Sequence, residues 1–397
     1  MSLASCTILA RNYLPRALLL ADSLREHGSE HPLIVFLIDA ERDTELPSID
    51  GVRWMRPADL DLPEPALLDL AASYDLVEFA TALKPLVLQA LLEEIEQVAY
   101  LDPDTYVMAP MIELGPALDA SAGIVLTPHY LEPIAGEQRF SEGHLLHVGV
   151  YNLGFIAVDR RAGPFLQWWW GHLQSECLHG PLDGLFTDQK WVDVGAVLFD
   201  ASALRHHGYN VSVANLHERP IVAGADGYRI ATSGDRLRLM HFHAFDPQRP
   251  DDLYGRARTI TPAAGSQPAA DGAVAQIARR YAAALIEKQS RLGPQPAYIY
   301  NADTTGRPIS RRMRHAYRST VLEAPGSLPS PFRAAEAAAY AAWRRGARPL
   351  AARLVLSDIA KGVRCALPDE YDALKRRFPG AARALRAKVV EDGGMWG

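Results

Sequence analysis

Two carboxylates separated by one residue follow an apolar run in the first third of the sequence. The run Val98–Leu101 leads directly into Asp102, Pro103 and Asp104. Such a run is typical of a buried strand, and ligands bind at the carboxyl ends of strands in open α/β sheets. In an extended segment the side chains of residues i and i+2 point to the same side, so both carboxylates would converge on one hard divalent cation. A turn that begins at Asp102 and is fixed by Pro103 is the structural alternative.

A second apolar run with polar residues at its end lies far along the chain. The run Leu237–Phe242 includes His241, and His243 follows it. Histidine is a common ligand of transition metals such as Mn²⁺ and is less natural for Mg²⁺. We therefore expect one of these histidines to complete a metal site with the two aspartates. A histidine with a purely structural role is the alternative.

The elements that must position these residues follow from the hydrophobic pattern. Short apolar runs predict strands near residues 5–10, 33–38, 52–55, 98–101, 123–126, 152–158 and 237–242. Helical spacing predicts helices over 14–24, 79–92, 274–292 and 334–388, and another that starts at Pro164. Residues 263–273, rich in Ala, Gly, Pro and Ser, are expected to form a linker or loop. Alternating strands and helices predict an α/β fold with an open, doubly wound and mostly parallel sheet.

Composition excludes several classes of protein. The chain has 397 residues, of which 48% are hydrophobic and 22% charged, so it is neither disordered nor fibrous. No apolar run approaches the roughly 18 residues of a membrane-spanning helix, and the first residues lack the layout of a signal peptide. The cysteines at 6, 177 and 365 are too scattered for a disulfide framework or a zinc site. These features favour a cytoplasmic protein.

Charge is distributed unevenly along the chain. Residues 301–397 contain 18 Lys and Arg against 9 Asp and Glu, a net charge of +9, whereas residues 1–300 carry −15. A basic appendage suggests docking to an anionic partner, either a phospholipid surface or a phosphate-bearing substrate. The sequence thus leaves open a peripheral contact with the inner membrane face, with a solvated helical face as the alternative. We expect no nucleic-acid partner.

Several short segments, taken in order, resemble one known family. The segments are Ile8–Leu14, Glu78–Pro85, Asp102–Asp104, Asn152–Gly154, Thr187–Lys190, Tyr209–Arg219 and His241. The chain resembles glycosyltransferases of the GT-A fold, and among them the retaining family that contains glycogenin and the bacterial lipopolysaccharide galactosyltransferases. The resemblance covers roughly residues 5 to 250, and the joint order of the motifs carries it.

The resemblance implies an overall organisation and an activity. A GT-A catalytic domain would span residues 1–255, and a mostly helical, basic region would span 256–397. The activity would be transfer of a hexose from a nucleotide-sugar, a UDP-sugar, with Mn²⁺ or Mg²⁺ and with retention of configuration. The acceptor stays open among a saccharide, a lipid-linked saccharide, a metabolite and a protein side chain.

The same resemblance implies roles for individual residues. Asp102, Asp104 and His241 would hold the metal, and Asp188 and Gln189 would lie beside the donor sugar as catalytic residues. The donor would be bound by Leu9, Ala10, Arg11, Tyr13, Lys84, Asp102 and Asn152. Because Asp188 directly precedes Gln189, a helix N-cap is the structural alternative for it.

Two segments of the chain bear on departures from this family and on rival functions. The segment after His241 lacks the glycine and lysine that approach the diphosphate in close relatives, and Arg249 is the nearest basic substitute. A nucleotidyltransferase is a rival, but it would carry a glycine-rich, basic loop after the first strand, and Ala10–Tyr13 is not one. A degenerate transferase fold that acts as a scaffold is the other rival.

Overall fold

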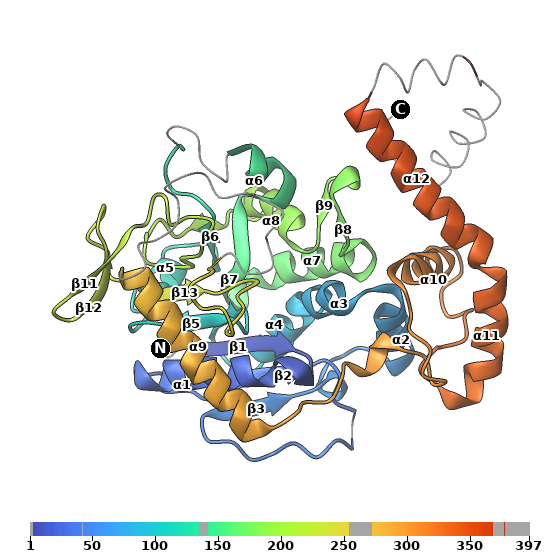
Figure 1. The fold of residues 1–397 in the computed structure, drawn as a ribbon, viewed down its shortest axis with the longest axis horizontal. Coiled ribbons are helices and arrows are strands. Elements are labelled where there is room, and N and C mark those ends of the chain that lie inside the picture. The colour runs from blue at the N-terminus through green and yellow to red at the C-terminus, as the bar shows by residue number, and fades with distance from the viewer. Residues whose placement is uncertain (1–2, 42, 135–141, 254–271, 368–376, 378–397) are drawn as a thin grey trace. The chain divides into compact units, whose positions relative to one another are not determined.

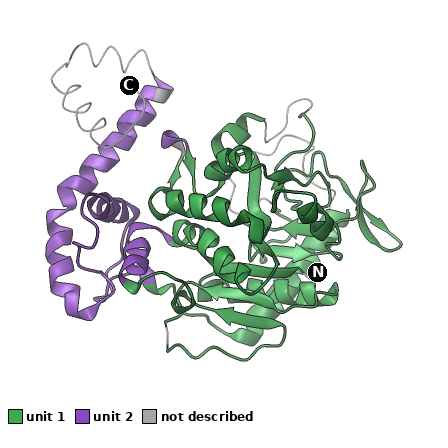
Figure 2. Ribbon diagram, turned by 180° about the vertical axis from the view of Figure 1, so that it is seen from behind, with its two compact units in different colours: residues 1–64, 76–181, 185–299 green, residues 65–75, 182–184, 300–397 purple. Residues whose placement is uncertain are grey.

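The described part of the chain forms two compact units. A computed structural model describes residues 3–41, 43–134, 142–253, 272–367 and 377 (Figure 1). The first unit comprises residues 1–64, 76–181 and 185–299, and the second comprises 65–75, 182–184 and 300–397 (Figure 2).

A seven-stranded sheet forms the centre of the first unit. Its strands are β1 (Ala4–Leu9), β2 (Leu33–Leu37), β3 (Val52–Met55), β4 (Gln97–Leu101), β6 (Ile124–Pro128), β7 (Tyr151–Asp159) and β10 (Ser202–Ala203). They lie in the order β10-β6-β7-β4-β1-β2-β3. Only the pairings of β7 with β4 and β6 are antiparallel. Strands β1, β2, β4 and β6 are buried throughout, which explains their uninterrupted apolar sequences.

Helices cover both faces of this sheet. One face packs on α1 (Leu14–Glu26) and α5 (Leu114–Asp119) through a core that includes Leu18, Leu114 and Phe155. The other is covered by α3 (Leu76–Ala82), α4 (Lys84–Leu92), α7 (Gly163–Glu176) and α8 (Gln189–Leu198). The short helix α6 (Glu142–Val148) precedes β7. The predicted doubly wound, mostly parallel α/β fold is confirmed.

The predicted helix over residues 79–92 is wrong in one respect. The segment forms two helices, α3 and α4, which are interrupted at Leu83. Pro85 causes this break, because its nitrogen cannot donate to a preceding carbonyl and its ring would clash with the previous turn. Because of this break, Lys84 is the first residue of α4, and its side chain reaches Asp188 beyond the amino end of the helix.

A smaller ladder lies beside the main sheet. Strand β13 (Leu239–His241) pairs antiparallel with β5 (Thr105–Val107). Its support is α9 (Ala273–Leu292), whose Tyr281 stacks on Phe242 with ring centroids 3.9 Å apart. Figure 1 shows α9 running beside α1, and the two helices are in contact.

Helix α9 bears on the predicted organisation of the chain. It belongs by its packing to the first unit, while the predicted domain boundary at residue 255 stays a prediction. Residues 263–271 of the predicted linker lie outside the described residues, and Ala273 already begins α9. The remaining two-stranded ladders are β11 (Ile221–Gly224) with β12 (Gly227–Ile230), and β8 (His179–Gly180) with β9 (Leu185–Phe186).

The second unit is helical. It contains most of α2 (Glu64–Ser73) together with α10 (Arg311–Glu323), α11 (Ala337–Gly346) and α12 (Arg348–Ala366). The buried guanidinium group of Arg314 donates to the carbonyl oxygens of Ala71, Tyr74 and Tyr300, which joins α10 to the end of α2. The predicted helical C-terminal extension is confirmed through residue 366. Beyond 367 the predicted helix lies outside the described residues, apart from residue 377.

Two further expectations concern membranes and disulfides. No helix within the described ranges combines the length and the apolar character needed to cross a bilayer. Cys6 and Cys177 are both buried, and neither forms a disulfide bond.

Candidate active site

Backbone pairing brings His241 to the two aspartates. Asp102 directly follows β4, and its N–H donates to the carbonyl of Gly154 on β7 at 2.9 Å. Asp102–Thr105 then form a turn, in which the N–H of Thr105 donates to the carbonyl of Asp102 at 3.0 Å. Because β5 begins at Thr105 and Thr105 pairs with His241, the imidazole lies next to Asp104.

The expected extended geometry of residues 102–104 is therefore wrong. Asp at the first position of a turn and Pro at the second are both favoured, so this sequence bends rather than continuing as a strand. The turn and the metal-site hypotheses are compatible, because the turn itself directs both carboxylates toward one point.

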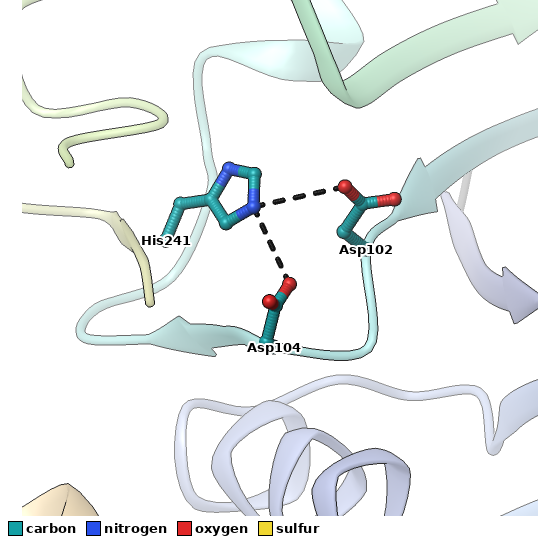
Figure 3. Close-up of side chains that lie close together, drawn as sticks. All are labelled: Asp102, Asp104 and His241. Atoms are coloured by element: carbon teal, nitrogen blue, oxygen red, sulfur yellow. Dashed lines mark ion pairs between the residues drawn. The ribbon is translucent and has the colours of Figure 1, made fainter. Parts of the chain in front are cut away.

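Asp102, Asp104 and His241 form a compact group (Figure 3). The Nε2 atom of His241 lies 3.3 Å from Oδ1 of Asp104 and 3.6 Å from Oδ2 of Asp102. Within the described ranges no other cluster of three or more His, Cys, Asp and Glu residues has a spacing suited to a metal ion. Two carboxylates and one imidazole fit a divalent cation that accepts both oxygen and nitrogen ligands.

Burial and mutual charge shift the pKa values of this group in different directions. Burial raises the pKa of Asp102, although Lys84 and His241 oppose the shift. Burial would also raise the pKa of Asp104, but the hydrogen bond and charge of His241 outweigh it and lower that pKa. Burial would lower the pKa of His241, and here Asp104 and Asp102 outweigh it and raise the pKa. The charge states of the three groups therefore depend on one another, in a site where His241 is buried and both aspartates are partly buried.

Lys84 connects the metal group to the next part of the site. Its Nζ donates to Oδ2 of Asp188 at 2.8 Å and to the carbonyl of Leu153 at 2.9 Å. It also lies 3.9 Å from Oδ1 of Asp102 and 4.4 Å from the ring centre of Tyr100. The hydroxyl of Tyr100 donates to the same Asp102 oxygen. Burial would lower the pKa of Lys84, but the charges of Asp188 and Asp102 outweigh it and raise the pKa.

Asp188 and Gln189 lie at the start of α8. Asp188 occupies the N-cap position, but its side chain makes no capping hydrogen bond and turns to Lys84 instead. The side-chain amide of Gln189 donates to the carbonyl of Val148 at 2.6 Å and accepts from the N–H of Leu153 at 3.2 Å. Gln189 thereby clamps the start of β7. The catalytic roles of both residues stay predictions.

The residues expected to bind the donor fall into two places. Asn152 and Lys84 lie near the metal group, and Oδ1 of Asn152 accepts from the N–H of Gly154 at 3.0 Å. Leu9 and Ala10 are buried at the carboxyl end of β1. Arg11 follows them and bonds to Asp39 through its N–H and its guanidinium group, both at 3.0 Å.

Tyr13 lies below the guanidinium group of Arg16, which is 5.1 Å from its ring centre. In the described chain no hydrogen bond or ion pair joins Arg11 or Tyr13 to Asp102, Asp104 or His241. The structure therefore places Leu9, Ala10 and Arg11 at the end of β1 and Asp102 at the end of β4, and these two strands are neighbours in the sheet. Lys84 lies at the start of α4 and Asn152 near the start of β7.

Sequence reasoning missed Arg16, Asp39 and the structural role of Asn210. Burial would raise the pKa of Asp104, and the charge of Arg16 helps His241 to lower it. The Nη2 atom of Arg16 donates to the carbonyl of Phe245 at 3.2 Å. A basic residue in the first turn of a helix opposes the helix dipole, and this signal could have drawn attention to Arg16. Arg249, the expected substitute for the missing lysine, is half-exposed and pairs with Asp252 at 3.8 Å.

Comparisons with known proteins give one relative and several similar structures. No protein-family model matches the chain. The uncharacterized protein YfnF of Bacillus subtilis (strain 168) is 28% identical over 257 residues, which cover 62% of this chain and 82% of YfnF.

Three solved structures of glycosyltransferases show some likeness. One is involved in the glycosylation of the major capsid of PBCV-1 (TM-score 0.36, 11% identity, 64% of this chain and 99% of that chain). The second is mouse xyloside xylosyltransferase 1 in its apo form (TM-score 0.32, 15% identity, 51% of this chain and 83% of that chain). The third is GlyE of Streptococcus pneumoniae TIGR4 (TM-score 0.40, 14% identity, 74% of this chain and 64% of that chain). We take the fold class from the strand order rather than from these scores, and the glycogenin-like family is not confirmed.

Gly154 provides the space that the imidazole of His241 occupies. A Cβ atom at residue 154 would lie 2.6 Å from Nδ1 of His241 and would also overlap Cε1. We therefore expect Gly154→Ala to displace the ring and to destabilise the fold by about 1–3 kcal/mol, as overpacking does. Urea unfolding measures the cost, and a Mn²⁺ titration measures the loss of the site. Gly171→Ala is the matched control, because nothing lies within 4 Å of its Cβ position in α7, and it should be neutral or stabilising. Equal effects of the two substitutions would contradict this account.

Lys84 should be needed for stability as well as for the site. Lys84→Met leaves Asp188 buried without its cation, which we expect to lower the free energy of unfolding by about 3–5 kcal/mol. Adding Asp188→Asn should restore part of the loss, because the unpaired charge is then removed. Arg53→Met is the control, since the exposed pair of Arg53 with Glu94 should contribute less than about 1 kcal/mol. A loss as small as that of the control would show that the Lys84 ion pair is dispensable.

Proposed function

We propose that the chain is a metal-dependent glycosyltransferase that moves a hexose from a nucleoside diphosphate donor to an acceptor. The observation that carries this proposal is the grouping of Asp102, Asp104 and His241 where β4 ends, beside the end of β1. The strand order changes direction between β1 and β4, and such switch points are the usual ligand sites of open α/β sheets. The motif residues of this proposed catalytic domain lie within residues 1–255, and α9 supports them from beyond that boundary.

The donor set suits the chemistry of a diphosphate leaving group. A divalent cation held by Asp102, Asp104 and His241 would stabilise the negative charge that develops when the anomeric bond breaks. The imidazole ligand favours Mn²⁺ over Mg²⁺. Lys84 holds Asp102 in place and adds positive charge to the site.

Arg16 is the residue we assign to the phosphates in place of the lysine that the segment after His241 lacks. Its charge reaches Asp104, and its Nη1 is buried without a hydrogen-bond partner among the described residues. A guanidinium group with a free edge can bind a phosphate oxygen. Arg249 is less suitable, because it is half-exposed and already paired with Asp252.

The remaining features of the proposal rest on the motif resemblance. The donor is a UDP-sugar, and the transfer retains configuration, with Asp188 beside the developing positive charge of the sugar. The Lys84 contact supports this role, since it holds the Asp188 carboxylate turned away from the end of α8. The acceptor class stays open.

Nucleotide binding that depends on Asp102 is the first test. Wild-type protein should melt about 5–10 °C higher with UDP and Mn²⁺ when the nucleotide is present at about 100 times its Kd, and GDP and dTDP should have smaller effects. Asp102→Asn should abolish the metal-dependent part of the shift and the release of UDP from a UDP-sugar. Differential scanning fluorimetry and a UDP-release assay measure the two effects. Asp61→Asn, which changes an exposed carboxylate, is the control.

The same experiment separates the proposal from its rivals. Release of pyrophosphate instead of UDP would indicate a nucleotidyltransferase. A protein that melts cooperatively but responds to none of the nucleotides would indicate a scaffold. Full activity of Asp102→Asn would refute the site assignment.

Helix α12 has a second apolar face, which bears on the location of the acceptor. One face packs on α10 through Ala347, Ala351 and their neighbours. The other exposes Val355, Leu356 and Ile359, and Leu367 is exposed directly after the helix. Arg353 and Arg364 flank this stripe. Large apolar side chains beside arginines are typical of helices that lie on anionic bilayers. We assign the stripe to contact with the inner face of an anionic membrane, which fits a lipid-linked acceptor.

Vesicle binding tests this assignment. Wild-type protein should sediment with vesicles that contain phosphatidylglycerol and should be released by salt, because arginines near the surface contribute about 1 kcal/mol each. Leu356→Glu with Ile359→Glu should abolish binding, since both side chains lie in the stripe. Val222→Glu, at an exposed apolar residue of β11, is the control. Failure of the wild type to bind, or equal binding of the double variant, would contradict the membrane contact.

A further inference from the structure

The side-chain amide of Asn210 is buried, and all of its groups have partners. Its Nδ2 donates to Oγ1 of Thr127 at 2.9 Å and to the carbonyl oxygen of Asn152 at 3.0 Å. Its Oδ1 lies 2.9 Å from Nδ1 of His241. A carbonyl oxygen can only accept, so the NH₂ group must face Asn152 and the amide oxygen must face the imidazole. The orientation of the amide is thus fixed by its partners.

This orientation determines which nitrogen of His241 carries a proton. An amide oxygen can only accept, so Nδ1 of His241 must be the donor. In the neutral imidazole, Nε2 is then unprotonated, and this atom faces Asp104 and Asp102 at 3.3 and 3.6 Å. Either a proton on Nε2 or a bound cation relieves the repulsion between this atom and the two carboxylate oxygens, and a divalent cation would take the place of that proton. Histidines that bind metals commonly donate their other N–H to a fixed acceptor in this way.

The backbone around Asn210 is held firmly. Its φ is 51°, in the left-handed region, where asparagine is several-fold enriched among non-glycine residues. The next residue, Val211, donates to the carbonyl of Leu239 at 2.9 Å and accepts from the N–H of His241 at 2.8 Å. Because these two bonds flank β13, Asn210 is kept in register with His241. Few residues other than asparagine combine this backbone conformation with a side-chain acceptor.

We propose that Asn210 is a positioning residue that presents Nε2 of His241 to a divalent cation and thereby makes the site selective for Mn²⁺ over Mg²⁺. The proposal rests on the metal site of the proposed function. Mn²⁺ accepts imidazole nitrogen readily, whereas Mg²⁺ prefers oxygen ligands and keeps much of its water. Loss of the Asn210 contact should therefore weaken Mn²⁺ binding while Mg²⁺ binding through the carboxylates changes little.

Metal binding without nucleotide provides the test. Free Mn²⁺ is followed by electron paramagnetic resonance during titration with MnCl₂, and Mg²⁺ affinity is obtained by competition with MgCl₂. Asn210→Gly keeps the backbone conformation and removes the acceptor, so the Mn²⁺ Kd should rise about 10–100-fold, the usual effect of losing such a partner. Asn210→Ala is the second truncation, should the added freedom of glycine prevent folding. The ratio of Mn²⁺ to Mg²⁺ affinity should fall in both.

Two further variants separate positioning from general stability. Asn210→Asp keeps an acceptor for Nδ1 and should retain the wild-type affinity ratio, even though it loses the donors to Thr127 and Asn152. Thr127→Val removes one partner of the amide but leaves the His241 contact, so it should lower the melting temperature without changing the ratio. Both results are expected only if the acceptor itself matters.

The outcomes distinguish this inference from the proposed function. Wild-type protein that binds no Mn²⁺ would overturn the metal site and with it the proposed function. Wild-type protein that binds Mn²⁺, with truncated Asn210 variants that keep the same affinity ratio, would overturn only the role of Asn210. A ratio that falls equally in Thr127→Val would also overturn it, because loss of packing would then explain the effect.

Discussion

The candidate site depends on the contacts of one buried group, the ammonium group of Lys84. Taking a lysine out of water is costly, and here the cost is offset by the carboxylate of Asp188, the nearby charge of Asp102 and the carbonyl of Leu153. These partners come from the start of α8, the end of β4 and the start of β7. One side chain therefore ties together segments that lie up to about a hundred residues apart. Asp188 and Asp102 face this one lysine, whereas Asp104 faces His241, so a divalent cation bound here would add positive charge beside the carboxylates.

The direction of β7 explains why residues distant in sequence meet at this edge of the sheet. Parallel strands bring only their carboxyl ends to the site, whereas β7 is antiparallel and brings its amino end. Leu153 and Gly154 are thus placed beside the end of β4, where Gly154 accepts from the N–H of Asp102 and leaves room for His241. A parallel strand at this position would place these residues at the opposite edge. The candidate site therefore requires that β7 pair antiparallel with its neighbours.

The sequence predicted the layers of the fold and the metal-binding group better than the contacts that support them. Buried strands such as Leu33–Leu37 and amphipathic helices such as α9 follow from local periodicity, and Asp102, Asp104 and His241 were found by their places in an ordered set of motifs. The turn at Pro103 was weighed only as an alternative, although its composition favours a turn. The helix break at Pro85 was missed. The role of Asn210 had no local signal, because its partners Thr127, Asn152 and His241 are 31 to 83 residues away and no periodicity records such contacts.

The metal-binding group joins two separately supported parts of the first unit. Asp102 is fixed to the main sheet through Gly154, while His241 belongs to the β5–β13 ladder. The ladder is supported from behind by α9, where Tyr281 stacks on Phe242, the neighbour of His241. Helix α9 in turn packs on α1, which covers the main sheet. The separation of His241 from Asp102 therefore depends on the packing of a helix that follows all the motif residues in sequence. It follows that α9 is part of the structural support of the site, and that a chain ending before residue 273 would keep every proposed ligand but lose the packing that holds His241 beside the aspartates.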